Sequence, residues 1–269
     1  MTRRFLGLAV LAALAVACRT PPPSIGSSTL VDLTHAYDRE TIYWPTDVDG
    51  FVLEPLSAGI NEQGYYYAAN RFSTAEHGGT HLDAPLHFAA DGNAVDAVPL
   101  DRLVGPAVVV DVTAAAAADP DYQVSRADFE RFEARHGELA AGVIVLLRTG
   151  FGGQWGDRAA YLGTAKTGPA AIPELHFPGL DPDAARWLVA ERQIAAIGLD
   201  TASIDYGQSK LFESHRTLFA AQIPAFENLA NLDRLPESGF EVVALPMKIR
   251  GGSGAPLRAI AILRRSGSF

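Results

Sequence analysis

The sequence contains very little cysteine, and this scarcity limits the kinds of metal site and cross-link that the protein can form. Cys18 is the only cysteine among 269 residues, which excludes an internal disulfide and any cysteine-rich zinc or iron–sulfur site. A bound metal would therefore need imidazole and carboxylate ligands. Positive charge is also scarce, because 22 Lys and Arg face 31 Asp and Glu for a formal charge of -9. That balance argues against a general nucleic-acid binder, which needs a basic face for phosphates.

No apolar run near the start is long enough for a transmembrane helix. The run at 5–17 follows Arg3 and Arg4 and has the length of a signal-peptide core. Small residues at 15–17 suit a cleavage site, and Cys18 follows at once, a placement that resembles a bacterial lipoprotein signal. We therefore expect an exported, periplasmic or cell-envelope protein that is lipidated at Cys18. Ordinary secretion with cleavage before Cys18 is the alternative.

The composition changes only once after this leader. The segment 18–28 is rich in proline and serine and is typical of a tether. The remainder has the mix of apolar and charged residues of an ordinary globular protein and shows no second boundary. The sequence thus predicts a signal peptide at 1–17, a lipidated cysteine and tether at 18–28, and a single domain at 29–269.

Strands and helices alternate along this domain. Short apolar runs rich in β-branched residues predict five strands, at 107–112, 143–147, 194–199, 241–245 and 259–263. Ser125 can cap a helix that carries Phe129 and Phe132 at helical spacing, and Asp181-Pro182 opens another. These elements predict an α/β domain with at least five strands, in which the share of parallel pairing stays open.

The chemistry-bearing residues cluster between His77 and His87, where three of the seven histidines lie. A helix is disfavoured there, because Gly78-Gly79 and Pro85 interrupt the segment. In an extended chain, His81 and a carboxylate two residues later point to the same side.

That carboxylate is Asp83, and the double glycine lets the chain turn so that His77 joins the pair. Two neutral imidazoles and one carboxylate form half of a site for Zn²⁺ or Mn²⁺, with positions open for water. His87 lies farther along, where it could touch a bound substrate without being a ligand.

The stretch H-G-G-T-H-L-D-A-P-L-H-F, from His77 to Phe88, closely resembles the signature of the metal-dependent cyclase superfamily, which includes bacterial kynurenine formamidase and isatin hydrolase. The resemblance extends over nearly the whole chain beyond the leader, through the segments 32–35, 43–45, 147–150, 177–180, 198–205 and 223–229. It implies a swivelling β/β/α domain. It also implies a homodimer or a larger homo-oligomer.

The resemblance also implies roles for single residues. The first metal ion would be bound by His77, His81 and Asp83. In members with two ions, His215 would bind the second ion, and Asp83 and Glu227 would contact both. With one ion, Glu227 could serve as a supporting partner or a base.

The same resemblance makes His87 the catalytic proton carrier and places Trp44 beside the substrate. The expected activity is metal-dependent hydrolysis of an amide, either an aryl formamide or a cyclic amide such as isatin, with one or two Zn²⁺ or Mn²⁺ ions. A lactone hydrolase or cyclase of the same superfamily is an alternative. Another is a non-catalytic metal- or ligand-binding envelope lipoprotein, although such a protein should have lost His87 or an open metal position. The glycine-rich segment 251–254 lacks the lysine of a phosphate-binding loop and predicts only a β-turn.

Overall fold

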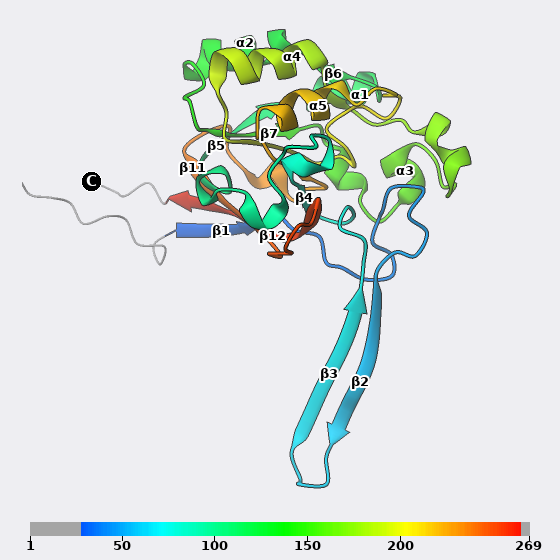
Figure 1. Ribbon diagram of the computed structural model, residues 1–269. Helices are drawn as coiled ribbons and strands as arrows, with labels where there is room; N and C mark the ends of the chain where they lie inside the picture. The colour runs from blue at the N-terminus through cyan, green and yellow to red at the C-terminus, as the bar shows by residue number, and fades with distance from the viewer. Residues whose placement is uncertain (1–27, 265–269) are drawn as a thin grey trace, which may run out of the picture.

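The computed structural model describes residues 28–264, which form one α/β domain with a projecting arm (Figure 1). The strands are β1 Ser28–Asp32, β2 Val52–Ile60, β3 Tyr66–Ser73, β4 His81–Asp83, β5 Val104–Asp111, β6 Gln123–Val124, β7 Ile144–Arg148, β8 Gly179–Leu180, β9 Ala196–Leu199, β10 Ala225–Glu227, β11 Phe240–Pro246 and β12 Gly254–Arg264. The α-helices are α1 Thr113–Ala118, α2 Arg126–His136, α3 Arg158–Leu162, α4 Pro182–Trp187 and α5 Glu213–Ala220. The single α/β domain expected from the sequence is confirmed.

The main sheet has eight strands in the order β1-β12-β11-β5-β7-β9-β10-β4. Its central strands β5, β7, β9 and β10 run parallel, whereas β11, β12 and β4 pair antiparallel with their neighbours. Because β12 also pairs with β4, the sheet closes on itself and resembles a barrel. In the closed sheet, the short strand β4 lies between β10 and β12. This strand carries the expected metal ligands His81 and Asp83.

Helices α2, α4 and α5 lie together over one side of the sheet (Figure 1). Strand β7 is a nearly continuous run of buried Ile, Val and Leu, and every residue of β9 is buried, as expected for strands covered on both faces. Phe129 and Trp187 from two of these helices and Phe219 from the third join the apolar layer beneath them. Local sequence signals fix where these helices begin. Ser125 and Asp128 form a capping box at the start of α2, and the Asp181 side chain caps α4.

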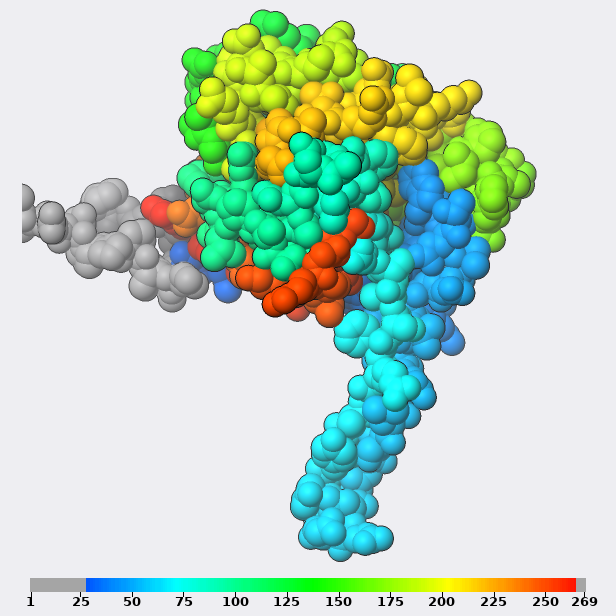
Figure 2. Space-filling view, viewed as in Figure 1, coloured from blue at the N-terminus to red at the C-terminus, as the bar shows by residue number. Residues whose placement is uncertain are grey.

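The hairpin of β2 and β3 extends away from the body as a free-standing arm (Figures 1 and 2). Large apolar side chains along it are exposed: Val52, Leu53, Leu56, Ile60, Tyr65, Tyr66, Tyr67 and Phe72. An isolated two-stranded ribbon with this much exposed apolar surface is marginally stable in water and is typical of an interaction surface.

The expected signal peptide, Cys18 and most of the tether lie outside the described residues. Within residues 28–264, none of the helices combines the length and the apolar character that a bilayer crossing requires.

Candidate metal centre

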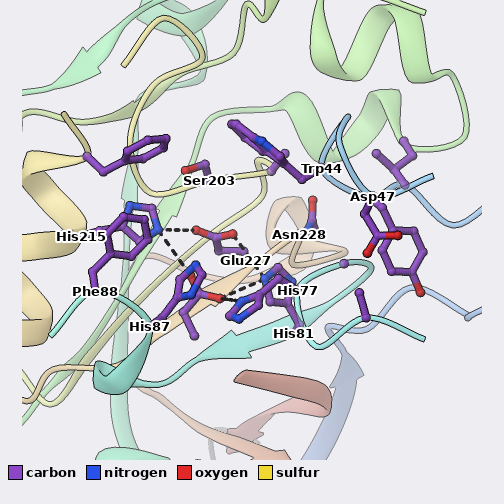
Figure 3. A pocket seen from close by; sticks show the side chains of 17 residues that line it. Trp44, Asp47, His77, His81, His87, Phe88, Ser203, His215, Glu227 and Asn228 are labelled. Carbon is purple, nitrogen blue, oxygen red and sulfur yellow. Dashed lines mark hydrogen bonds and ion pairs between the residues drawn. The ribbon is translucent and has the colours of Figure 1, made fainter. Parts of the chain in front are cut away.

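Strand pairing brings together ligands that are far apart in the sequence. In the β10–β4 ladder, Glu227 faces His81 and Ala225 faces Asp83. Residues opposite each other on neighbouring strands share a face of the sheet, so the Glu227 and His81 side chains emerge on the same side. Helix α5 supplies His215, which lies at the left of the cavity in Figure 3.

All five predicted metal ligands converge at this point. His77 Nδ1 lies 2.6 Å from Asp83 Oδ1, and His81 Nε2 lies 3.0 Å from the same oxygen and 3.4 Å from Glu227 Oε2. His215 Nε2 lies 3.3 Å from Asp83 Oδ2 and 3.3 Å from Glu227 Oε1. Four of the side chains are almost fully buried, and His77 is partly exposed. Ligands about 2.0–2.2 Å from one zinc ion lie at similar separations from each other.

The hydrogen bonds of His81 show that the residues fit a cation. Its Nδ1 donates to the Gly79 carbonyl at 2.9 Å, which leaves the lone pair of a neutral ring on Nε2. That Nε2 is buried without a hydrogen-bond partner and faces oxygens of Asp83 and Glu227. A lone pair aimed at two carboxylates is repulsive unless a positive charge lies among them.

His215 repeats this pattern on the other side. Its Nδ1 donates to Asp205 Oδ2 at 2.6 Å, so its Nε2 is directed at the second oxygens of Asp83 and Glu227. Each of these two carboxylates therefore presents one oxygen toward His81 and the other toward His215. That arrangement suits two divalent ions bridged by carboxylates as well as one ion.

Protons take the place of the cation when no ion is bound. Burial opposes protonation of His81, but Asp83 and Glu227 outweigh it and raise the pKa of His81 to about 9. Burial likewise opposes protonation of His215, yet Asp205, Asp83 and Glu227 hold its pKa well above the ordinary value. Binding of a divalent ion must therefore displace protons, which makes metal affinity dependent on pH.

The two carboxylates differ in their tendency to ionise. Burial would raise the pKa of Asp83, but the neighbouring imidazoles His77, His81 and His215 hold it well below its usual range. Burial, followed by the charge of Asp83, raises the pKa of Glu227. Asp83 is therefore the fixed negative charge of the centre, and Glu227 is the carboxylate that can hold a proton when no ion is bound.

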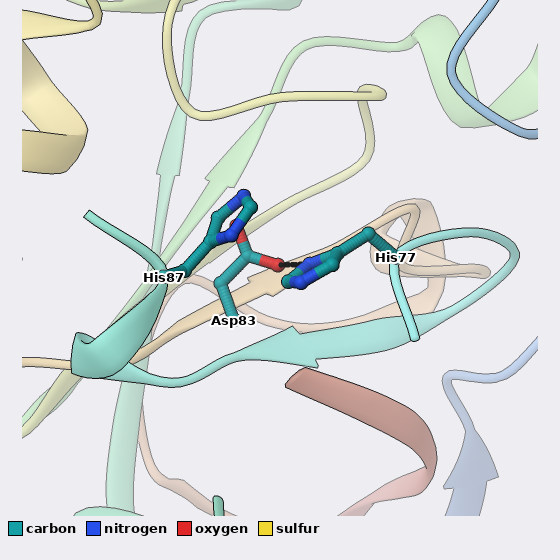
Figure 4. A group of neighbouring side chains, drawn as sticks. All are labelled: His77, Asp83 and His87. Carbon is teal, nitrogen blue, oxygen red and sulfur yellow. Dashed lines mark hydrogen bonds and ion pairs between the residues drawn. The ribbon is translucent and has the colours of Figure 1, made fainter. Parts of the chain in front are cut away.

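His87 lies beside the ligands, at the end of the short 3-10 turn Pro85–His87. Its ring stacks on His77 with centroids 3.8 Å apart, and one ring nitrogen approaches His77 and Asp83 ligand atoms within 4.8 Å (Figure 4). Burial lowers the pKa of His87 to about 4, so the ring is neutral at pH 7 and can accept a proton. The same position would also allow metal ligation.

A cavity of about 330 Å³ opens onto these ligands (Figure 3). Its walls are largely aromatic: Trp44 meets Phe212 edge-on at 6.5 Å between ring centroids, and Phe88 lies 5.3 Å from Phe212. Asp47, Ser203 and Asn228 add polar atoms to the lining. Cavities of this size and character hold small, flat, mostly apolar molecules. Trp44 thus lines the same cavity as the ligand set.

The remaining histidines lie outside this cavity. His35 stacks on Trp155 with centroids 4.1 Å apart. His176 pairs with Asp121, and His136, the last residue of α2, pairs with Glu237. Their contacts are local packing and side-chain hydrogen bonds.

The sequence analysis did not identify the residues that form hydrogen bonds to the ligand histidines. Asp205 lies in the segment 198–205, which carried only a resemblance, and its contact with His215 has no local signature. Ser253 lies in the predicted glycine-rich turn and reaches His77 Nε2 at 2.8 Å. Only the pairing of β12 with β4 places that turn at the metal centre.

The sequence is similar to those of known proteins. The Cyclase family model matches residues 31–206. The isatin hydrolase of Roseibium aggregatum is 35% identical over 215 residues, which cover 77% of this chain and 79% of that protein. The kynurenine formamidase of Salinibacter ruber is 32% identical over 238 residues, which cover 86% and 96% of the two chains.

Solved structures give the same result. Isatin hydrolase A from Ralstonia solanacearum superimposes with a TM-score of 0.81 at 32% identity, over 92% of this chain and 100% of that one. An isatin hydrolase bound to the product analogue thioisatinate superimposes with a TM-score of 0.80 at 31% identity, over 89% and 94%.

Proposed function

Because this chain belongs to the Cyclase family, we propose that it is a metal-dependent hydrolase that opens the amide bond of an aryl formamide or of a cyclic amide such as isatin. The observation that carries this conclusion is the convergence of His81 and His215 nitrogen lone pairs with Asp83 and Glu227 oxygens in one cavity. In support, relatives that align with this chain along most of their length are named isatin hydrolase and kynurenine formamidase.

The bound ion would be Zn²⁺ or Mn²⁺, because imidazole and carboxylate are ligands that both ions accept. It would be held by His77, His81 and Asp83, and a second ion by His215 with Asp83 and Glu227. When bound, such an ion supplies a Lewis acid that polarises the carbonyl and lowers the pKa of water.

The side chains of this protein supply the rest of the mechanism. The neutral His87 ring would accept a proton from water as its oxygen forms the new C–O bond at the carbonyl carbon, and would then give that proton to the leaving nitrogen as the C–N bond breaks. Trp44, Phe88 and Phe212 hold an aryl ring and exclude bulk water from the reacting carbonyl. Turnover therefore needs both the ligand set and the aromatic walls.

The test is a substrate panel with metal-loaded protein. Isatin, N-formylkynurenine and simple lactones are offered separately, and ring opening or formate release is followed. We expect hydrolysis of at least one amide at a rate that exceeds lactone hydrolysis. Preference for lactones would favour the alternative activity, and failure with every substrate, in protein that holds its metal, would contradict the proposal.

We also propose that the protein acts as a homodimer joined through the β2–β3 arm. Support comes from the exposed apolar side chains of the arm, among which Ile60 and Tyr66 are cross-strand partners that are 70% and 65% exposed. Light scattering should give the mass of a dimer. The double variant Ile60→Lys, Tyr66→Lys should be monomeric, whereas Ser238→Lys on the body should stay dimeric. A monomeric native protein at all concentrations would contradict this assembly.

We propose, finally, that the protein is exported and anchored by a lipid on Cys18. The short apolar leader, the small residues before Cys18 and the tether at 18–28 support this location. Mass spectrometry of the native protein should find residue 18 as a lipidated N-terminus, and Cys18→Ser should release the protein from membranes. An intact Met1 or an unmodified Cys18 would contradict it.

A further inference from the structure

The turn between β11 and β12 forms a hydrogen-bonded chain that ends on His77. Ser253 Oγ lies 2.8 Å from His77 Nε2. The same hydroxyl donates to Glu76 Oε2 at 2.7 Å, and the Ser253 backbone N–H donates to that oxygen at 3.0 Å. Glu76, Ser253 and His77 are therefore linked in one line, although 176 residues separate His77 from Ser253.

Counting hydrogens along this line fixes the tautomer of His77. A serine hydroxyl carries one hydrogen, and a carboxylate can only accept hydrogen bonds. The Ser253 hydroxyl therefore donates its hydrogen to Glu76. Ser253 Oγ can then only accept a hydrogen from His77 Nε2. The lone pair of the neutral ring is left on Nδ1, which lies 2.6 Å from Asp83 Oδ1.

The turn is built to approach His77 closely. A Cβ atom at Gly254 would lie 2.5 Å from His77 Cε1, and one at Gly252 would lie 2.6 Å from Glu76 Oε1. A side chain at either glycine would therefore force His77 or Glu76 to move. The Ser253 carbonyl also accepts from the Ala84 backbone N–H at 2.9 Å, which ties the turn to the strand that carries the ligands.

From these contacts we infer that Glu76 and Ser253 are positioning residues, which hold His77 as the Nε2–H tautomer so that it binds metal through Nδ1. His81 and His215, whose Nδ1 atoms are already engaged, present Nε2 instead. This inference rests on the metal centre of the proposed function. Beyond that function, it identifies Nδ1 as the atom of His77 that binds metal, and Glu76 and Ser253 as the residues that determine this choice.

The charge of Glu76 strengthens this arrangement. A carboxylate that accepts a hydrogen bond relayed from a ligating imidazole orients the ring and makes it a better donor to the metal. Loss of such partners lowers metal affinity by roughly 10–100-fold. Because Glu76 reaches the ring only through Ser253, the two side chains should act as a unit.

The main test measures the dissociation constant of Zn²⁺ by chelator competition. We expect Ser253→Ala to weaken binding by roughly 10–100-fold, Ser253→Thr to restore most of it, and the control Ser238→Ala to leave it unchanged. Glu76→Gln should weaken binding in the native background and add little in the Ser253→Ala background, since residues in one chain are not additive. Additive effects, or native affinity in Ser253→Ala, would overturn the inference.

A spectroscopic test reads the tautomer directly. ¹⁵N–¹H spectra of the Zn²⁺-loaded protein should show His77 with a proton on Nε2 and the ion on Nδ1, and Ser253→Ala should shift the Nε2 resonance. The opposite assignment would overturn the inference while leaving the metal centre intact. Protein that binds no metal at all would instead refute the proposed function, so the two failures are distinguishable.

Discussion

Glu227 and His81 face each other across the β10–β4 ladder, with His81 Nε2 lying 3.4 Å from Glu227 Oε2. The contact is made by strand pairing, and the chain between the two residues forms most of the parallel sheet. The metal centre therefore depends on closure of the barrel, where β4 is inserted between β10 and β12.

Glu227→Gln should impair catalysis strongly. The amide keeps the shape of the side chain but loses the charge that holds a cation against His81 and His215. We expect kcat/KM to fall by roughly a hundredfold or more. Steady-state kinetics measure the loss, and Glu191→Gln at an exposed position on the body is the matched control. Equal activity in the Glu227 and Glu191 variants would show that Glu227 has no part in catalysis.

His81→Ala and His87→Ala should separate metal binding from proton transfer. The first removes a buried ligand, so metal occupancy should fall together with activity. The second should leave occupancy nearly intact and lower turnover by roughly a hundredfold, the usual contribution of a general acid–base group. Elemental analysis of both variants provides the comparison. Loss of metal from the His87 variant would identify His87 as a ligand, which its distance from His77 and Asp83 permits.

His215→Ala tests the number of ions. His215 Nε2 faces Asp83 Oδ2 and Glu227 Oε1, the carboxylate oxygens directed away from His81. His215 should therefore bind the second of two ions, and its loss should affect binding of the first ion much less. With two ions in the native protein, the variant should bind one and lose most activity. Calorimetric titration with Mn²⁺ gives the stoichiometry. One ion in both proteins would show a site with a single ion, and two ions in both would show that His215 is not a ligand.

His35 should make stability depend on pH in the acid range. Burial lowers its pKa to about 4, partly offset by Asp32, whereas an unfolded chain binds that proton near pH 6.5. The folded protein therefore holds fewer protons, and the free energy of unfolding decreases as pH falls from about 6.5 to 4. His35→Phe keeps a ring against Trp155 and should remove on the order of 1–2 kcal/mol of this dependence.

The measurement for His35 is chemical denaturation of chelator-treated protein at several pH values. Chelation removes the contribution of metal binding from both proteins. The native protein and the His35→Phe variant should diverge below pH 6.5 and converge above it. Parallel stability curves over the whole range would show that His35 does not titrate on unfolding.

Local patterns were sufficient to predict much of the fold. The apolar runs at 107–112 and 143–147 correspond to β5 and β7, and Ser125 and Asp181 begin α2 and α4. Each of these signals lies within a few neighbouring residues. The extended form of His81–Asp83 follows in the same way from the glycines and the proline around it.

Features that depend on distant pairing could not be predicted. The register of Gly254 against Asp83 closes the barrel and brings Ser253 to His77, yet neither strand carries a signal for the other. The arm was missed because 52–60 and 66–73 are exposed on both faces and lack the alternation of a half-buried strand. The convergence of His215 and Glu227 with the first three ligands followed from family resemblance, not from spacing.

Amide hydrolysis by this ligand set should depend on a divalent ion. The most direct measurement is the rate of isatin and N-formylkynurenine hydrolysis by chelator-treated protein titrated with Zn²⁺ or Mn²⁺. We expect negligible activity without metal and a return of activity in proportion to bound ion, with saturation at one or two equivalents. Full activity in protein shown by elemental analysis to be free of metal would contradict it.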